Sequence, residues 1–100
     1  MSEAVPTEPA VVSFLNYLTV EKNCSPLTVT NYRKDIQVFQ TYLAAKGFTD
    51  FTWPSLTVLQ IRGYLAYMSD QQFARRTIAR RISSLRSFYK YLVREGKIAQ

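Results

Sequence analysis

The chain has no histidine and only one cysteine, Cys24. It therefore cannot form an internal disulfide, and it lacks both the common zinc ligand sets and an imidazole for acid–base catalysis. No apolar run approaches the ~18 residues of a membrane span. The first nine residues carry Glu3 and Glu8 rather than the basic and apolar segments of a signal peptide. These absences exclude most familiar catalytic sites, predict no metal, cofactor or membrane association, and favour a cytoplasmic protein.

The length and composition fit one folded domain. The chain has 100 residues, of which 47% are hydrophobic and 20% charged, with three glycines and four prolines, so it can bury a core. We expect a disordered lead-in at residues 1–9, a helical domain at residues 10–97, and the start of a linker to a further domain at residues 98–100.

Positive charge is concentrated in the C-terminal part of the chain. The formal net charge is +6, but residues 1–60 carry a net charge of −1 and residues 61–100 carry +7. No acidic run neutralises the basic part. This asymmetry favours a polyanionic partner, with nucleic acid ahead of an anionic membrane surface.

Hydrophobic periodicity predicts two helices in the first half of the chain. The first spans residues 10–22, with an apolar stripe at Val11, Phe14, Leu15 and Leu18. The second spans residues 26–46, because Ser25 and Pro26 form a start signal and Gly47 allows a left-handed stop. Its predicted core face is Val29, Tyr32, Ile36, Phe39 and Leu43.

The second half of the chain predicts a connecting loop and two more helices. Residues 48–55 form the loop, and Thr57 and Gln60 have the spacing of a capping box. The third helix then runs to about Asp70, with inward residues Ile61, Tyr64, Leu65 and Met68. The fourth spans residues 75–95 up to Gly96, with a stripe of Ile78, Ile82, Leu85, Tyr89 and Leu92. Since no alternating strand pattern competes, the predicted fold class is all-α: a compact bundle of four main helices around one core.

The face of the fourth helix opposite this stripe is basic and hydroxyl-rich. On a wheel of 100° per residue it contains Arg76, Arg80, Ser83, Ser84, Ser87 and Arg94, with Thr77 and Lys90 beside it. Arginines at a helix N-terminus suit phosphate, and short serines permit close approach to a groove. A solvated surface is the ordinary explanation of such a face. The scarcity of acidic residues on it favours a binding role instead.

The second helix offers a complementary set of donors. Thr30, Asn31 and Lys34 point outward, and Thr28 lies in the first turn. Threonine and lysine donate to phosphates, and asparagine can pair with adenine in the major groove. Alone, this set would be an ordinary surface. Its interest lies in its pairing with the basic fourth helix.

Two segments carry a resemblance to a known family. They are Ser25–Pro26–Leu27–Thr28 followed by Tyr32, Asp35 and Phe39, and the run Arg75–Leu92. Together they strongly resemble the N-terminal core-binding domain of tyrosine recombinases, the phage-integrase and Xer group. The likeness covers roughly residues 11–97, and Xer-like members look closer than distant phage integrases.

The resemblance implies a SAM-like helical domain that forms one half of a C-shaped clamp around a recombination half-site, with the second and fourth helices facing the major groove. The implied partners are double-stranded DNA, a C-terminal catalytic domain of the same chain, and other recombinase protomers. The DNA contacts that the resemblance implies are Thr28, Thr30, Asn31, Lys34, Arg76, Thr77, Arg80, Arg81 and Ser84. Of these, Arg81 lies toward the edge of the apolar stripe.

The resemblance also assigns the chemistry to another part of the protein. In the family, the nucleophilic tyrosine and the groups that stabilise the transferring phosphate belong to the catalytic domain. We therefore expect no catalysis from this chain, although its parent protein would break and rejoin DNA strands. Tyr32, Tyr64 and Tyr89 lie on apolar faces, and we expect core packing with hydrogen-bonded hydroxyls.

A second hypothesis comes from a different class of protein. The chain could be a helical protein–protein adaptor whose basic helix docks an acidic partner. A DNA-binding domain would have broad duplex affinity that falls steeply with salt, whereas an adaptor would ignore duplex DNA. A self-sufficient nuclease or topoisomerase is excluded, because no group of residues could activate a phosphate.

Overall fold

The computed structural model describes residues 8–48, 52–56 and 58–98. Its elements, in chain order, are α1 (Pro9–Val20), α2 (Pro26–Ala45), the short 3-10 helix η1 (Trp53–Ser55), α3 (Val58–Asp70) and α4 (Arg75–Arg94). The described residues contain no strand, and the prediction of an all-α fold is confirmed. None of these helices has the length and hydrophobicity needed to cross a lipid bilayer.

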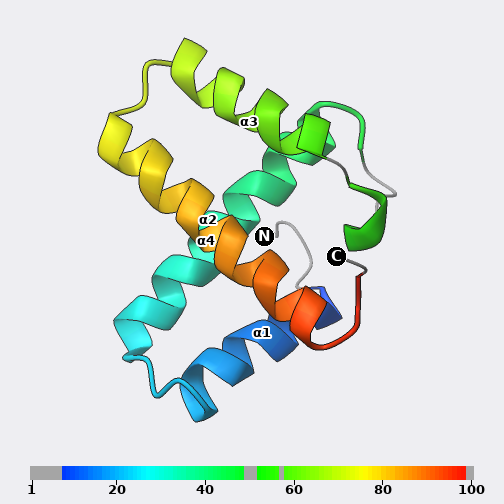
Figure 1. Ribbon diagram of the computed structural model, residues 1–100. Helices are drawn as coiled ribbons and strands as arrows, with labels where there is room; N and C mark the ends of the chain where they lie inside the picture. The colour runs from blue at the N-terminus through cyan, green and yellow to red at the C-terminus, as the bar shows by residue number, and fades with distance from the viewer. Residues whose placement is uncertain (1–7, 49–51, 57, 99–100) are drawn as a thin grey trace, which may run out of the picture.

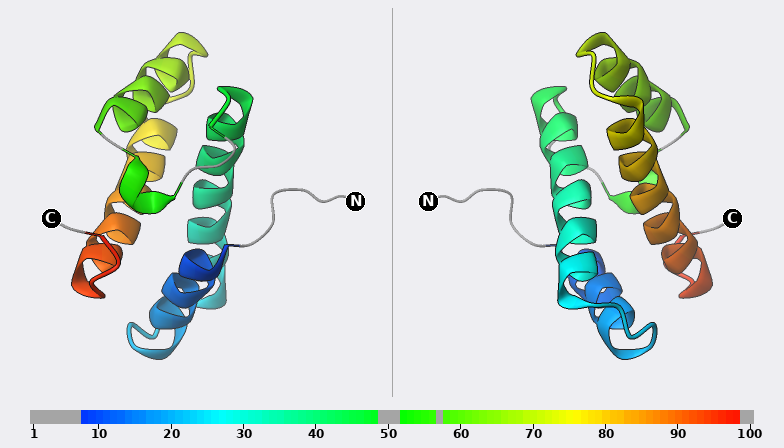
Figure 2. Two further views of the ribbon diagram at one scale, coloured as in Figure 1. Left: turned by 90° about the vertical axis from the view of Figure 1, so that its right-hand side faces the viewer. Right: turned by 90° about the vertical axis from the view of Figure 1, so that its left-hand side faces the viewer.

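The architecture is a crossing of two long helices with a shorter helix on either side. α2 and α4 cross, and α1 and α3 each pack against both of them (Figure 1). The N-terminal halves of α2 and α4 extend to the left in Figure 1 and face the viewer in the right-hand panel of Figure 2. No described helix lies over that side of the crossing, so both N-terminal halves are accessible from it.

Local signals set the ends of the helices. The Ser25 Oγ accepts a hydrogen bond from the Thr28 backbone N–H, and Pro26 takes the first helical position of α2. Gly47 and Gly96 follow α2 and α4 with φ angles of +91° and +72°, the left-handed conformation that ends a helix. These predicted ends are confirmed to within two residues. Thr57 lies outside the described residues, and with it the predicted capping box.

The helical domain extends beyond its predicted limits at both ends. α1 starts at Pro9, and the carboxylate of Glu8 accepts a hydrogen bond from the indole Nε1 of Trp53. Ile98, expected to begin a linker, packs against the core. Glu8, Pro9 and Ile98 therefore belong to the folded domain rather than to the lead-in or the linker.

Aromatic rings make up much of the core. Phe14 of α1 lies 5.2 Å from Phe88 and 5.4 Å from Tyr91 of α4, measured between ring centroids. The Trp53 ring meets Phe88 edge-on at 4.8 Å, so η1 closes over the same cluster. These contacts tie α1, η1 and the C-terminal half of α4 into one packed unit.

The buried face of α4 differs from the predicted stripe. The buried residues are Ser84, Leu85, Phe88, Tyr91 and Leu92, a set rotated by roughly 80° from the stripe predicted at 100° per residue. Leu85 and Leu92 belong to both sets, whereas Ile78, Ile82 and Tyr89 are only half-buried. The rings of Phe88 and Tyr91 are buried and pack against Phe14, and these contacts account for the orientation of the helix.

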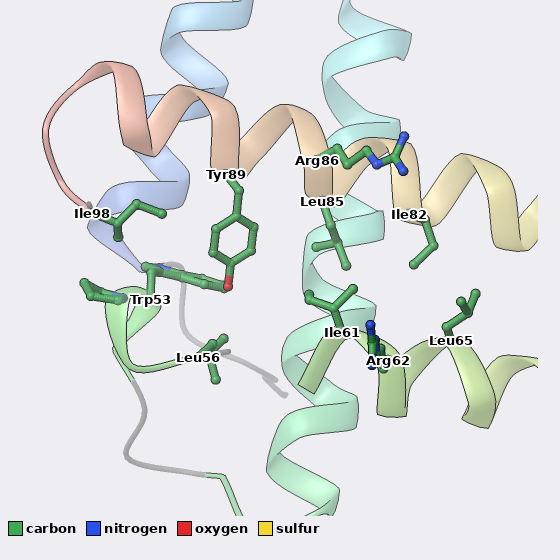
Figure 3. A pocket seen from close by; sticks show the side chains of 11 residues that line it. Trp53, Leu56, Ile61, Arg62, Leu65, Ile82, Leu85, Arg86, Tyr89 and Ile98 are labelled. Atoms are coloured by element: carbon green, nitrogen blue, oxygen red, sulfur yellow. The ribbon is translucent and has the colours of Figure 1, made fainter. Parts of the chain in front are cut away.

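Two of the half-buried stripe residues, Ile82 and Tyr89, border an open apolar hollow of about 580 Å³ among η1, α3 and α4. Figure 3 shows Ile82, Leu85 and Tyr89 reaching from α4 toward Ile61 of α3 and Trp53 of η1. Leu65, predicted to face inward, also lines this hollow and remains 44% exposed. The prediction that Leu65 is a core residue is wrong, because no described element covers the open side of the hollow.

We predict that the rotated face controls stability. Phe88→Ala should destabilise the protein by about 3–5 kcal/mol, since the ring is fully buried. Ile82→Ala should cost less than about 2 kcal/mol, because its side chain borders the hollow and already contacts solvent. Urea unfolding of the two variants measures the difference. Equal losses would mean that the predicted stripe, and not the rotated face, forms the core.

Candidate nucleic-acid interface

A buried carboxylate joins α2 to α4 at their crossing. Asp35 of α2 is 3% exposed, and its Oδ1 lies 3.0 Å from Nη2 of Arg80. Its Oδ2 accepts hydrogen bonds from Arg80 Nε at 3.3 Å and from the Ser84 hydroxyl at 2.7 Å. Both oxygens are therefore paired, and the two helices are held together by a two-point ion pair and a buried hydroxyl.

The local sequence explains why Asp35 is buried. It follows Tyr32 by three residues and precedes Phe39 by four, which is the spacing of the core face of α2. A carboxylate at such a position must be compensated, because an isolated charge in a low dielectric is very unfavourable. Arg80 and Ser84, one turn apart on α4, supply that compensation. In return, the Asp35 hydrogen bond and charge raise the pKa of Arg80.

The proposed contacts on α2 lie on its accessible N-terminal half. Asn31 and Lys34 are exposed, and Thr28 and Thr30 are half-buried. The Thr28 Oγ1 accepts a hydrogen bond from Ser25 Oγ at 3.0 Å, which leaves its own hydrogen free to donate. This part of α2 therefore presents hydroxyl, amide and ammonium donors.

Cations from the two helices gather around one hollow. Lys34 of α2 and Arg80 and Arg81 of α4 line an open hollow of about 740 Å³ on the α3 side of Asp35. Arg76 is exposed one turn before Arg80, and Thr77 is half-buried beside it. Of these cations, Arg80 is paired with Asp35, whereas Lys34 and Arg76 have no acidic partner in the part of the chain that the structure describes.

Arg81 is held on the side of α4 that faces α3. Its guanidinium lies over the Phe73 ring, 5.0 Å from the centroid. It also lies near the buried Tyr64 hydroxyl. Among the described residues, neither Arg81 Nε nor Tyr64 Oη has a hydrogen-bond partner of normal geometry. Arg81 is therefore half-buried at the edge of the apolar face, where the sequence places it.

Two predicted members of the basic face of α4 lie elsewhere. Ser84 is 5% exposed and donates to Asp35, so the prediction that it points outward is wrong. Arg94 pairs with Glu21 at the C-cap of α1 at 3.4 Å and lies over the Tyr17 ring, far along α4 from Arg76. The burial of Ser84 follows from the rotation of α4 toward Phe88 and Tyr91. Arg94 lies roughly five helical turns beyond Arg76, so it points in the same direction as Arg76 but is far from it along the helix axis. The structure thus brings Lys34, Arg80 and Arg81 together, and it places the Ser84 side chain in the core.

Tyr64 and Tyr89 are poorly suited to nucleophilic attack. Burial raises the pKa of Tyr89, and it also raises the pKa of Tyr64 despite the opposing effect of the nearby Arg81 guanidinium. A nucleophile needs the opposite shift. The Tyr89 hydroxyl has no hydrogen-bond partner among the described residues, so the prediction that it is hydrogen-bonded is wrong. The Tyr64 hydroxyl lies beside the Arg81 guanidinium, which acts on its pKa as a hydrogen-bond donor.

No three metal-ligand side chains cluster within the described ranges. The candidate interface consists of donors and cations on α2 and α4, arranged around the buried Asp35.

Comparison with known families identifies the family of the chain. The family of phage integrase N-terminal SAM-like domains matches residues 11–96. Because the match covers most of the chain, the chain belongs to this family. No solved structure matches it significantly.

The matching relatives narrow the class to tyrosine recombinases. The chain is 49% identical over 85 residues to the tyrosine recombinase XerC of Lacticaseibacillus casei, covering 84% of this chain and 28% of that protein. It is 40% identical over 86 residues to the tyrosine recombinase XerC of Oceanobacillus iheyensis, covering 86% of this chain and 28% of that protein. The chain thus spans less than a third of the length of these relatives and is similar to their N-terminal domain.

We predict that the Ser84 hydroxyl stabilises the fold. Ser84→Ala removes a donor from a buried carboxylate and should lower the free energy of unfolding by about 1–3 kcal/mol. Ser83→Ala, at the exposed neighbouring position, should change it by less than about 0.5 kcal/mol. Denaturant unfolding at pH 7 compares the pair. Similar values for both serines would contradict the burial of Ser84.

We also predict a loss of stability at alkaline pH. An unfolded tyrosine ionises near pH 10, but Tyr89 in the folded protein keeps its proton to higher pH. The unfolded state therefore loses its proton first, and the free energy of unfolding falls as the pH rises above about 10. Tyr89→Phe should reduce this fall, with little change at pH 7. Thermal melts between pH 8 and 11 test it, and an unchanged alkaline slope would contradict it.

Proposed function

We propose that the accessible N-terminal halves of α2 and α4 bind duplex DNA at a recombination half-site. The contacts proposed are Thr28, Thr30, Asn31, Lys34, Arg76, Thr77, Arg80 and Arg81. Ser84 is omitted, since its hydroxyl is buried and donates to Asp35. The observation that carries the proposal is the pinning of two donor-bearing helices at their crossing, with Lys34, Arg80 and Arg81 around one hollow.

The chemistry of these side chains supports a division of roles. Lys34 and Arg76 are exposed cations without acidic partners in the described chain, which suits contacts to phosphate. Asn31 is exposed and can donate to and accept from an adenine edge in the major groove. Phosphate contacts set the position of the domain, and base contacts set its sequence preference.

The remaining parts of the proposal concern the whole protein. Relatives named tyrosine recombinase are more than three times as long as the matched region. We propose that this domain works with a catalytic domain of the same chain and with other protomers on DNA, as part of a recombinase that breaks and rejoins strands. A cytoplasmic location, with access to the chromosome, belongs to the same proposal.

The salt dependence of duplex binding tests the proposed surface. The chain should bind a 30-bp duplex with an affinity that falls steeply with salt. Arg76→Ala should weaken binding to all sequences and reduce the magnitude of the log–log salt slope by ~1, because one phosphate contact is lost. Fluorescence anisotropy at several salt concentrations gives both quantities.

Arg62→Ala is the matched control. Arg62 lies on α3 at the apolar hollow of Figure 3, away from the N-terminal halves of α2 and α4. Its removal lowers the net charge by the same amount and should leave the slope nearly unchanged. If the two substitutions have equal effects on the salt slope, the DNA-binding surface is not where we propose it. If the chain binds no duplex at low salt, the adaptor hypothesis is favoured.

A further inference from the structure

An acidic side chain lies beneath the most basic part of the proposed DNA surface. Asp35 is buried there, and it engages Nε and Nη2 of Arg80 at 3.3 and 3.0 Å. Arginine has five N–H donors, so three remain after this pairing. The Arg80 side chain is 54% exposed, so the unpaired edge of the guanidinium is open to solvent on the surface that we assign to DNA.

The pairing changes what Arg80 can contribute to binding. A free arginine brings a full positive charge and loses rotamer freedom when it binds. Arg80 is already oriented by a fixed carboxylate, so it loses less entropy, and its charge is offset by that of Asp35. Arg80 therefore contributes little to the non-specific electrostatic attraction of DNA, but its guanidinium is well placed to donate hydrogen bonds in one direction. A directed pair of N–H groups matches the O6 and N7 acceptors of guanine in the major groove.

We propose that Asp35 is a positioning residue for sequence recognition, which holds Arg80 so that the free edge of its guanidinium donates to a guanine. This rests on the proposed function of the α2 and α4 surface. Asp35 itself does not touch DNA. Its buried charge also restrains binding to other sequences, because it cancels one cation on that surface.

Asp35→Asn separates this role from a purely structural one. The amide has nearly the same shape but no charge, and it presents one acceptor oxygen instead of two. Arg80 should then gain both mobility and an uncompensated charge. We expect tighter binding to unrelated duplex, a salt slope larger in magnitude by up to ~1, and loss of sequence preference. If the substitution only destabilised the fold, the variant would bind all duplexes more weakly.

The experiment begins with a pool of random 30-bp duplexes. Selection with the wild-type chain supplies a preferred duplex, and a shuffled duplex of the same composition serves as reference. Each guanine of the preferred duplex is then replaced in turn by 7-deazaguanine, which lacks the N7 acceptor. Wild-type protein should lose about tenfold in affinity at one guanine. Asp35→Asn should lose no more than about twofold there.

Glu95→Gln is the matched control for charge. It raises the net charge by the same amount at the C-cap of α4. That position lies fifteen residues, or about 22 Å of helix, from Arg80, beyond the ~8–10 Å over which exposed charges act at physiological salt. Glu95→Gln should keep the wild-type preference, salt slope and 7-deazaguanine sensitivity.

The possible results are distinct. If Asp35→Asn behaves like Glu95→Gln, or shows the wild-type sensitivity to 7-deazaguanine, the inference is overturned. If circular dichroism shows that Asp35→Asn is unfolded, Arg80→Lys tests the inference instead. Lysine keeps the positive charge but lacks the two parallel N–H donors of the guanidinium. Arg80→Lys should therefore lose the sequence preference and keep the wild-type salt slope. A retained preference in Arg80→Lys overturns the inference. If the wild-type chain binds no duplex, the proposed function itself has failed.

Discussion

A charged carboxylate buried between two helices constrains this fold more than any other single interaction. Asp35 must meet its partners with both oxygens, and only one relative placement of α2 and α4 brings Arg80 and Ser84 to it. The aromatic contacts of Phe14 with Phe88 and Tyr91 supply the favourable burial energy. Hydrophobic contacts tolerate small shifts, whereas three directed hydrogen bonds do not. The aspartate therefore selects one geometry among those that the apolar core would permit.

That geometry also determines which charges the surface retains. Asp35 offsets Arg80, and Glu21 offsets Arg94 at the other end of the bundle. Lys34 and Arg76 remain without acidic partners among the described residues and flank the Asp35 pair on two different helices. The net charge of +6 is thus not spread evenly over α4. Two of the cations without an acidic partner, Lys34 and Arg76, lie on the N-terminal halves of the two long helices, where no described helix covers them.

The fold class and the helix ends could be predicted because their causes are local in sequence. Ser25 with Pro26, and the glycines at positions 47 and 96, act on the backbone within one turn, whatever the rest of the chain does. The orientation of α4 could not be predicted in this way. Its apolar residues cover more than one face, and contacts with Phe14 of α1 and Trp53 of η1 favour Phe88 over Ile78. The partner of Arg80 lies 45 residues away, so a wheel of α4 alone shows a face without acids. One signal was present in the sequence: Asp35 lies at a core position of α2, and a charge at such a position requires a buried partner.

The rotation of α4 affects the proposed surface unequally along the helix, and this explains which site residues remain accessible. Ser84 lies where α4 is packed against α2, so the rotation carries it into the core. Arg80 lies at the boundary, with one edge of its guanidinium on Asp35 and the rest in solvent. Arg76 lies one turn earlier and stays exposed. Along α4, the buried Ser84, the oriented donor Arg80 and the free cation Arg76 therefore follow one another at intervals of four residues. This order suits a surface in which attraction to phosphate and selection of a base depend on different side chains.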